Sequence, residues 1–163
     1  VQEYDVVEPY HAILEHAAFK HRVSNFYDSV FEIPITEKYG RIISIAVLEH
    51  LEELPKIIAQ CGHLLDPEGS FRAGIPNEGT PLWKLGYRIT SGIEFRLKYN
   101  LNYDILMQHE HVNTADEIED VLKYFFQDVR YGVFGFSKQL AFYRFYECRN
   151  PDKEKCHNYL TQI

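Results

Sequence analysis

Residues 41–77 constrain the fold more than any other stretch of this chain, because the hydrophobic period changes twice within one short segment. Residues 42–47 are apolar apart from Ser44, without the alternation of a half-exposed strand. This pattern favours a central parallel strand that helices cover on both faces. From residue 51 to 65 the apolar residues recur at helical spacing, which predicts an amphipathic helix.

The end of the same segment predicts a turn and a second strand. Pro55 is acceptable in a helix only within the first turn, so it marks the helix start. Asp-Pro-Glu-Gly at 66–69 has turn composition, and residues 70–75 form a short strand that Pro76 ends. A strand, a crossover helix and a parallel strand are therefore expected.

Length, composition and charge narrow the class of protein. The 163 residues are 45% hydrophobic and 15% aromatic, which suits one domain with a sizeable core. The net charge of −7 disfavours non-specific nucleic-acid binding, so a small-molecule partner fits better. No apolar run of about 18 residues and no leader pattern is present, so we expect a cytoplasmic protein without a membrane span. The three cysteines have neither metal-ligand spacing nor an even number for disulfides.

Two predicted strands near the start of the chain each lead to an acidic residue. The strand over 4–7 ends at Glu8, and the strand over 23–27 ends at Asp28, with a helix predicted between them over 9–19. Carboxylates at the carboxyl ends of neighbouring parallel strands lie on the edge of the sheet that binds ligands in open α/β folds. A solvated glutamate before a proline turn is the alternative for Glu8.

Residues 78–112 interrupt the pattern and predict a helical insertion that covers the substrate. This segment is locally basic and aromatic within an acidic protein. The side chains proposed to bind substrate are Trp83, Tyr87, Arg88 and Arg96. They suit an anionic or aromatic group, and the alternative is a core-facing stripe with solvated cations.

His109 and His111 raise a metal hypothesis, because alternate residues of an extended segment point to one side. No third ligand is evident nearby, so no metal site is predicted. Thr114 and Glu117 form a capping box that starts a helix.

Two aromatic strands are expected over 128–134 and 140–148, joined by a glycine-containing turn. After Arg149 the periodicity is lost. We therefore expect an α/β domain over residues 1–150 and a C-terminal tail over 151–163.

The order of these motifs resembles the small-molecule branch of the class I S-adenosylmethionine-dependent methyltransferases. The resemblance rests on Val-Glu-Pro after the first strand, on IISIAVLEHLEEL, and on HLLDPEG followed by a strand that ends in IPN. It also includes His-Val-Asn-Thr at the start of a helix that precedes an aromatic strand pair. The family implies a Rossmann-like, doubly wound, mostly parallel sheet with a terminal antiparallel strand pair.

One departure from the family concerns the start of the chain. The family's first strand and its Gly-rich cofactor loop should precede Glu8 by about 20 residues, but only seven residues do. Either an N-terminal portion is missing from the sequence, or the protein has lost the loop and cannot bind cofactor in the usual way. We expect the first, because without that strand the sheet would have two unpaired edges.

The resemblance also implies roles for individual residues. The cofactor-binding residues would be Glu8, Asp28, Ser29, Ser44, Ile45 and Ala46. Glu8 would bind the ribose hydroxyls, Asp28 and the Ser29 backbone would address the adenine, and residues 44–46 would line the methionine. His50 is placed to accept a proton from the acceptor, although the same position suits a histidine that caps or packs the helix start.

The predicted function is methyl transfer from S-adenosylmethionine to a small-molecule, sugar or lipid-linked acceptor. Two alternatives remain open at this point. A nicotinamide-dependent oxidoreductase is one, because Glu8 would serve an NAD ribose equally well. The other is a catalytically inactive methyltransferase-like module that acts by binding.

Overall fold

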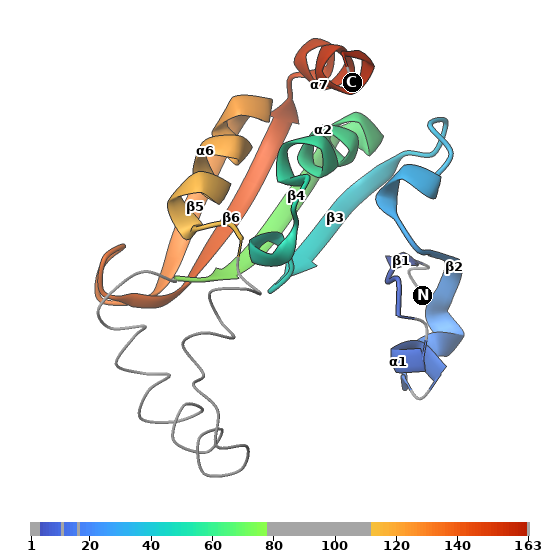
Figure 1. Ribbon diagram of the computed structural model, residues 1–163, viewed down its shortest axis with the longest axis horizontal. Coiled ribbons are helices and arrows are strands. Elements are labelled where there is room, and N and C mark those ends of the chain that lie inside the picture. The colour runs from blue at the N-terminus through green and yellow to red at the C-terminus, as the bar shows by residue number, and fades with distance from the viewer. Residues whose placement is uncertain (1–3, 11, 16, 78–111, 163) are drawn as a thin grey trace. The chain divides into compact units, whose positions relative to one another are not determined.

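A computed structural model describes residues 4–10, 12–15, 17–77 and 112–162 of the protein. The chain forms two compact units, Val1–Lys38 and Tyr39–Ile163 (Figure 1). The predicted insertion over 78–112, apart from Val112, lies outside the described residues, and so do its four proposed substrate-binding side chains and the histidines of the metal hypothesis.

The first unit is built on two parallel strands, as the sequence predicts. Strand β1 (Tyr4–Val7) pairs with β2 (Val23–Tyr27), and Val7 lies opposite Tyr27 in the register. The two strands lie parallel because the connection between them crosses over rather than forming a tight hairpin.

The helix predicted over residues 9–19 is wrong in extent. Helix α1 covers only Ala12–Glu15, and a short 3-10 helix, η1 (Lys20–Arg22), precedes β2. Ile13, on the predicted apolar face, is 61% exposed, so that face lacks the tertiary packing that stabilises a longer helix. A second 3-10 helix, η2 (Val30–Glu32), follows β2.

The second unit contains a four-stranded mixed sheet with the strand order β3-β4-β6-β5. Its strands are β3 (Tyr39–Ile45), β4 (Leu65–Pro76), β5 (Phe126–Gly135) and β6 (Ala141–Pro151). The predicted terminal antiparallel pair is confirmed, because β6 pairs antiparallel with β5. The sheet is mixed, because β3 and β4 pair in parallel, whereas β6 pairs antiparallel with both β4 and β5.

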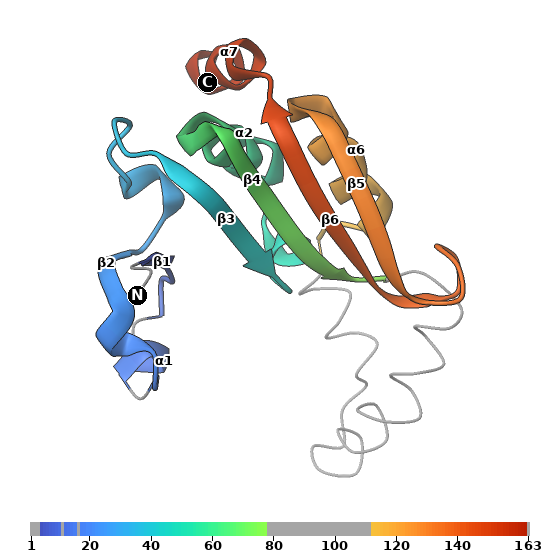
Figure 2. The same ribbon diagram turned by 180° about the vertical axis from the view of Figure 1, so that it is seen from behind.

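Helices α2 (Leu54–Leu64) and α6 (Ala115–Phe125) lie on one face of this sheet, and α7 (Lys153–Thr161) packs against α2 at one end of the sheet (Figure 1). The largest buried apolar side chains between these helices and the sheet include Leu54, Ile58, Leu64, Phe71, Ile118, Leu122 and Phe125. Figure 2 views the opposite face, which these helices leave uncovered. Among the described residues, none of the helices combines the length and apolarity needed to span a bilayer.

The prediction that helices cover both faces of β3 is wrong within the described residues. β3 is an edge strand of the four-stranded sheet, with β4 as its described neighbour. Ile43 and Ile45 are 61% and 55% exposed on the face opposite the helices. An unbroken apolar run does not itself say whether both faces of a strand are covered.

The β3–α2–β4 unit otherwise follows the prediction. Pro55 lies in the first turn of α2. Backbone N–H groups in the first turn have no acceptor within the helix, so the N–H that proline lacks is not needed there. Residues 66–69, which were predicted to form a turn, lie inside β4. They coincide with an irregularity in the pairing of β4 with β3, between Tyr39 and Arg41 of β3.

The predicted C-terminal tail is wrong. Residues Lys153–Thr161 form α7, which packs against α2 and buries Cys156 completely. Lys153 Nζ donates to the carbonyl oxygens of Gly62, His63 and Leu65, which caps the carboxyl end of α2. The sequence of α7 is mostly polar, so its periodicity is too weak to reveal the buried side.

Candidate functional site

The carboxyl ends of β1 and β2 bring Glu8 and Asp28 to neighbouring positions. Both residues directly follow Val7 and Tyr27, which are partners in the register. The Glu8 amide donates to the Tyr27 carbonyl at 2.9 Å, which extends the pairing by one step. Glu8 Oε1 accepts from the amide of Tyr10 at 2.8 Å. The predicted placement of two carboxylates at one strand edge is therefore realised.

Ser29 has a structural task in the same unit. Its hydroxyl accepts from the Phe31 amide at 3.3 Å and caps η2. The Asp28 amide donates to Glu32 Oε2 at 3.0 Å, while the Asp28 side chain is exposed. Glu32 was not anticipated from sequence, although its spacing four residues after Asp28 is a local signal.

In the second unit, the carboxyl end of β3 leads into a strained residue. Ile45 lies opposite Gly74, and the Ala46 amide donates to the Gly74 carbonyl at 2.8 Å. Ala46 has a φ of 52°, in the left-handed region that costs a residue with a side chain about 1 to 2 kcal/mol. The hydroxyl oxygen of Ser44 is buried and makes no hydrogen bond within the part of the chain that is described.

His50 and Glu49 occupy the 3-10 helix η3 (Leu48–His50) that follows this strand end. The His50 side chain is 41% exposed, with Nε2 4.0 Å from Glu49 Oε1. Glu49 is 2% exposed, and among the described residues its Oε2 has no hydrogen-bond partner. This buried carboxylate was not predicted from the sequence, because charged residues at helix starts are usually solvated.

Asn113 fixes the position of η3. Its Nδ2 donates to the carbonyl oxygens of Leu48 at 2.9 Å and Leu51 at 2.7 Å. The amides of Val112 and Asn113 both donate to the Glu49 carbonyl. The residues before α6 therefore hold the loop that carries His50, and the capping box of Thr114 then starts α6 as predicted.

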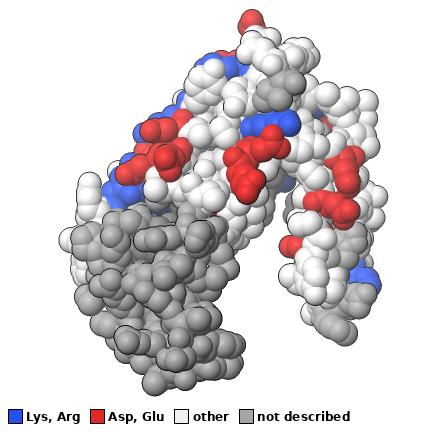
Figure 3. Space-filling view, viewed as in Figure 1, with Lys and Arg blue, Asp and Glu red and all other residues white. Residues whose placement is uncertain are grey.

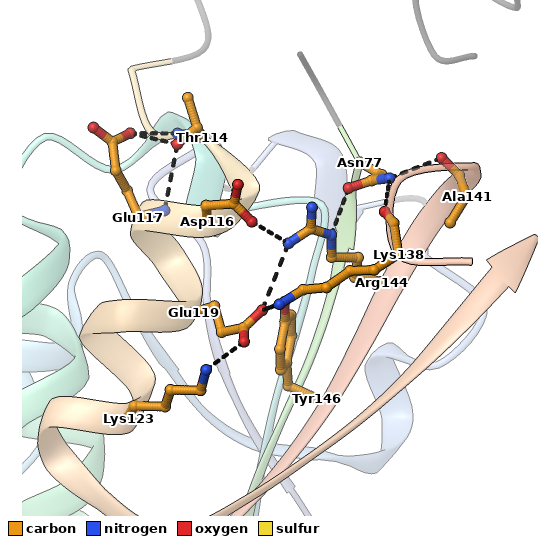
Figure 4. Close-up of polar contacts among 10 residues, drawn as sticks. All are labelled: Asn77, Thr114, Asp116, Glu117, Glu119, Lys123, Lys138, Ala141, Arg144 and Tyr146. Carbon is orange, nitrogen blue, oxygen red and sulfur yellow. Dashed lines mark hydrogen bonds and ion pairs between the residues drawn. The ribbon is translucent and has the colours of Figure 1, made fainter. Parts of the chain in front are cut away.

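Asn77, at the carboxyl end of β4, joins this edge of the sheet to the β5–β6 turn (Figure 4). It is fully buried, and its Nδ2 donates to the carbonyl oxygens of Lys138 at 2.8 Å and Ala141 at 3.0 Å. Its Oδ1 accepts from Nε of Arg144, which is 4% exposed. Arg144 Nη1 also donates to Asp116 in the first turn of α6.

Glu119 anchors the second half of this network. It lies on α6, is 4% exposed, and accepts from Lys123 at 2.6 Å, Lys138 at 2.5 Å and Tyr146 at 2.7 Å. Burial raises the pKa of its carboxyl group, but these hydrogen bonds and the charge of Lys138 outweigh burial and lower the pKa to about 2. Burial and the Glu119 carboxylate raise the pKa of Tyr146, so its hydroxyl stays protonated.

The structure thus groups the predicted residues into two sets. Glu8, Asp28 and Ser29 lie in the first unit, and Ser44, Ile45, Ala46 and His50 lie in the second. The buried network of Asn77, Asp116, Glu119, Arg144 and Tyr146 was not predicted (Figure 4). The sequence could not predict these contacts, because they join residues up to 67 positions apart, which share no local spacing pattern.

Comparison with known proteins identifies the fold. No family model matches the chain, and no curated protein matches its sequence. Solved structures do match. The SAM-dependent methyltransferase from Thermotoga maritima superposes with a TM-score of 0.62 at 10% identity, covering 91% of this chain and 72% of that one.

Two further methyltransferases give the same result. The N-methyltransferase NodS from Bradyrhizobium japonicum, in complex with S-adenosyl-L-homocysteine, matches at TM-score 0.55 and 18% identity, over 91% of this chain and 65% of that one. An O-methyltransferase family protein from Burkholderia thailandensis matches at TM-score 0.52 and 14% identity, over 93% of this chain and 44% of that one. The chain spans less than two thirds of these two proteins. It has the fold of the class I methyltransferases, so the resemblance seen in the sequence is confirmed at the level of the fold.

Proposed function

We propose that this protein transfers a methyl group from S-adenosylmethionine to a small-molecule acceptor. The observation that carries the proposal is the placement of Glu8 and Asp28 at the ends of neighbouring parallel strands, in a chain with a methyltransferase fold. NodS, which has the same fold, is bound to S-adenosyl-L-homocysteine, the demethylated form of that cofactor. The nicotinamide-dependent alternative is not favoured, because the similar structures described above are methyltransferases.

The residues of the first unit fit the adenosine part of this cofactor. The backbone amide of Tyr10 donates to Glu8 Oε1, so we assign Glu8 Oε2 to accept a hydrogen bond from a ribose hydroxyl. The Asp28 carboxylate is exposed at the adjacent strand end, where it and the Ser29 backbone would address the adenine. Two short strands hold these groups, which limits the entropy lost when the ligand binds.

In the second unit, we assign residues 44–46 to the methionine part of the cofactor. Ala46 has a left-handed conformation directly after β3, and both Ile45 and Ala46 are exposed at this strand end. Local strain of this kind clusters at ligand sites.

The chemistry asks the protein mainly for positioning. When bound, the cofactor would supply a methyl group activated by its sulfonium, for in-line transfer to an acceptor atom with the sulfur as the leaving group. The chain must align the acceptor and exclude water. His50 is the titratable group that we assign to accept the acceptor proton, because Asn113 and the η3 backbone hold it at the end of β3. Selectivity for an anionic acceptor, through Arg88 and Arg96, stays a prediction from sequence.

Calorimetry with S-adenosyl-L-homocysteine tests the cofactor assignment. Glu8→Ala should weaken binding by about 1 to 3 kcal/mol, because charge-assisted hydrogen bonds to the ribose are lost. Glu37→Ala, which removes an exposed carboxylate of the same unit, is the matched control and should leave the affinity unchanged. Tight NADH binding without S-adenosyl-L-homocysteine binding would reverse the assignment.

A further inference from the structure

The turn between β5 and β6 carries a cluster of exposed apolar side chains, which we call the hairpin tip. It consists of Phe134, Phe136, Leu140 and Phe142. Phe136 is 95% exposed and Phe134 is 67% exposed. Single exposed apolar residues are ordinary, but these four fall within nine positions of one hairpin, and the rings of Phe134 and Phe142 lie 6.5 Å apart. Grouped exposed apolar side chains of this kind mark binding surfaces.

The hairpin tip has a defined backbone conformation. Gly135 has a φ of 151°, and a Cβ at this position would lie 2.4 Å from the Leu140 carbonyl oxygen, so only glycine fits. The Phe136 amide donates to the Leu140 carbonyl at 3.0 Å, and the Leu140 amide donates to the Ser137 carbonyl at 3.0 Å. These bonds fix the backbone at Phe136, so its exposed side chain extends from a closed turn.

The hairpin tip is anchored to the sheet edge where the candidate site lies. Asn77, at the end of β4, donates to two carbonyl oxygens of the turn, and its own amide donates to the Phe142 carbonyl at 2.9 Å. β3 ends one strand away, because Ile45 lies opposite Gly74 of β4. Both views show the β5–β6 turn at the same end of the sheet as the arrowhead of β3 (Figures 1 and 2).

We propose that the hairpin tip binds the apolar portion of the methyl acceptor, an aromatic ring or alkyl chain, and so determines acceptor specificity. This proposal rests on the proposed function. Phe136, the most exposed member of the patch, is the residue expected to contribute most. In this proposal, the buried side chains of Asn77 and Arg144 have the role of holding the hairpin tip beside the carboxyl ends of β3 and β4.

The charges around the hairpin tip favour an acceptor over an anionic lipid surface. Lys138 is the cation of the turn, and its ammonium group is paired with Glu119 at 2.5 Å. The chain carries a net charge of −7, and Figure 3 shows acidic side chains gathered over α6 on the face in view. Binding to anionic membranes relies on clustered lysine and arginine residues beside the apolar ones, and the described part of the turn offers no such cluster.

A series of 4-alkylphenols, from 4-methylphenol to 4-hexylphenol, probes this surface by calorimetry. If the chain packs on the hairpin tip, wild-type affinity should rise about threefold to fourfold for each added methylene. Phe136→Ser should reduce this to less than about twofold per methylene. Ile35→Ser is the matched control, because Ile35 is another exposed apolar side chain, and it should keep the wild-type dependence.

The titrations are run with and without S-adenosyl-L-homocysteine, which separates the two proposals. If the wild type does not bind S-adenosyl-L-homocysteine, the proposed function is overturned. The dependence of affinity on the length of the alkyl group tests the hairpin tip by itself. The same dependence in wild type and Phe136→Ser overturns the hairpin-tip proposal. Two other results would also overturn it. One is flotation with phosphatidylcholine vesicles that Phe136→Ser abolishes, and the other is a wild-type dimer in sedimentation that this variant dissociates.

Discussion

Replacement of Glu119 by glutamine tests the buried network that joins α6 to the β5–β6 hairpin. Glu119 is almost completely buried and accepts hydrogen bonds from two lysines and Tyr146. The pKa of its carboxyl group is lowered from the ordinary 4.5 to about 2, because those contacts outweigh burial. Glutamine keeps the shape and one acceptor oxygen but removes the charge that pairs with Lys123 and Lys138.

The magnitude follows from the linkage between pKa and stability. One pKa unit corresponds to about 1.4 kcal/mol, so ionised Glu119 stabilises the folded state by about 3 kcal/mol at pH 7. The sign is that of a depressed pKa. The stabilisation is complete above the unfolded value of 4.5 and is lost as the pH falls toward 2. About 2 kcal/mol of it should be lost between pH 7 and pH 3.

Urea unfolding followed by circular dichroism at pH 7, 5, 4 and 3 measures this effect. The difference in unfolding free energy between wild type and Glu119→Gln should shrink by about 2 kcal/mol over that range. Asp120→Asn, on the exposed side of α6, is the control and should differ from wild type by less than about 0.5 kcal/mol. A Glu119→Gln difference that stays constant from pH 7 to pH 3 would refute the argument.

Two further substitutions test packing between α2 and α7. Gly62→Ala should destabilise the protein by about 1 to 3 kcal/mol in urea unfolding, because the added Cβ would lie 2.7 Å from Sγ of buried Cys156. Gly40→Ala, whose Cβ would meet no atom within 4 Å, should be near neutral, and equal effects would contradict this packing argument. Lys153→Met should cost about 1 to 3 kcal/mol, because the carbonyl oxygens at the end of α2 lose their donor. The exposed neighbour is the control, and a loss from Glu154→Gln as large as that from Lys153→Met would argue against the cap.

Local sequence signals predicted most elements of the fold. The alternation of strands and helices, Pro55 in the first turn of α2 and the capping box of α6 are all present in the structure. These signals act between residues three or four positions apart, so they need no knowledge of the rest of the chain. The positions of Glu8 and Asp28 follow in the same way, since each directly follows its own strand.

Other features depend on contacts between distant residues. The sequence of α7 lacks a clear apolar face, and it is packed because Lys153 and Cys156 meet the end of α2. Ile43 and Ile45 are exposed because they lie on the face of β3 opposite the helices, although the same apolar run would suit a strand covered on both faces.

The candidate site likewise has some features that local sequence predicted and others that depend on tertiary contacts. The sequence by itself determined which strand ends carry acidic residues and where His50 follows β3, because strand ends and turns are encoded by neighbouring residues. Only the tertiary structure decided that Arg144 meets Asn77 and Asp116, that Glu49 is buried, and that the hairpin tip lies at the same edge. The order of strands in the sheet sets these contacts, and hydrophobic periodicity carries no information about that order.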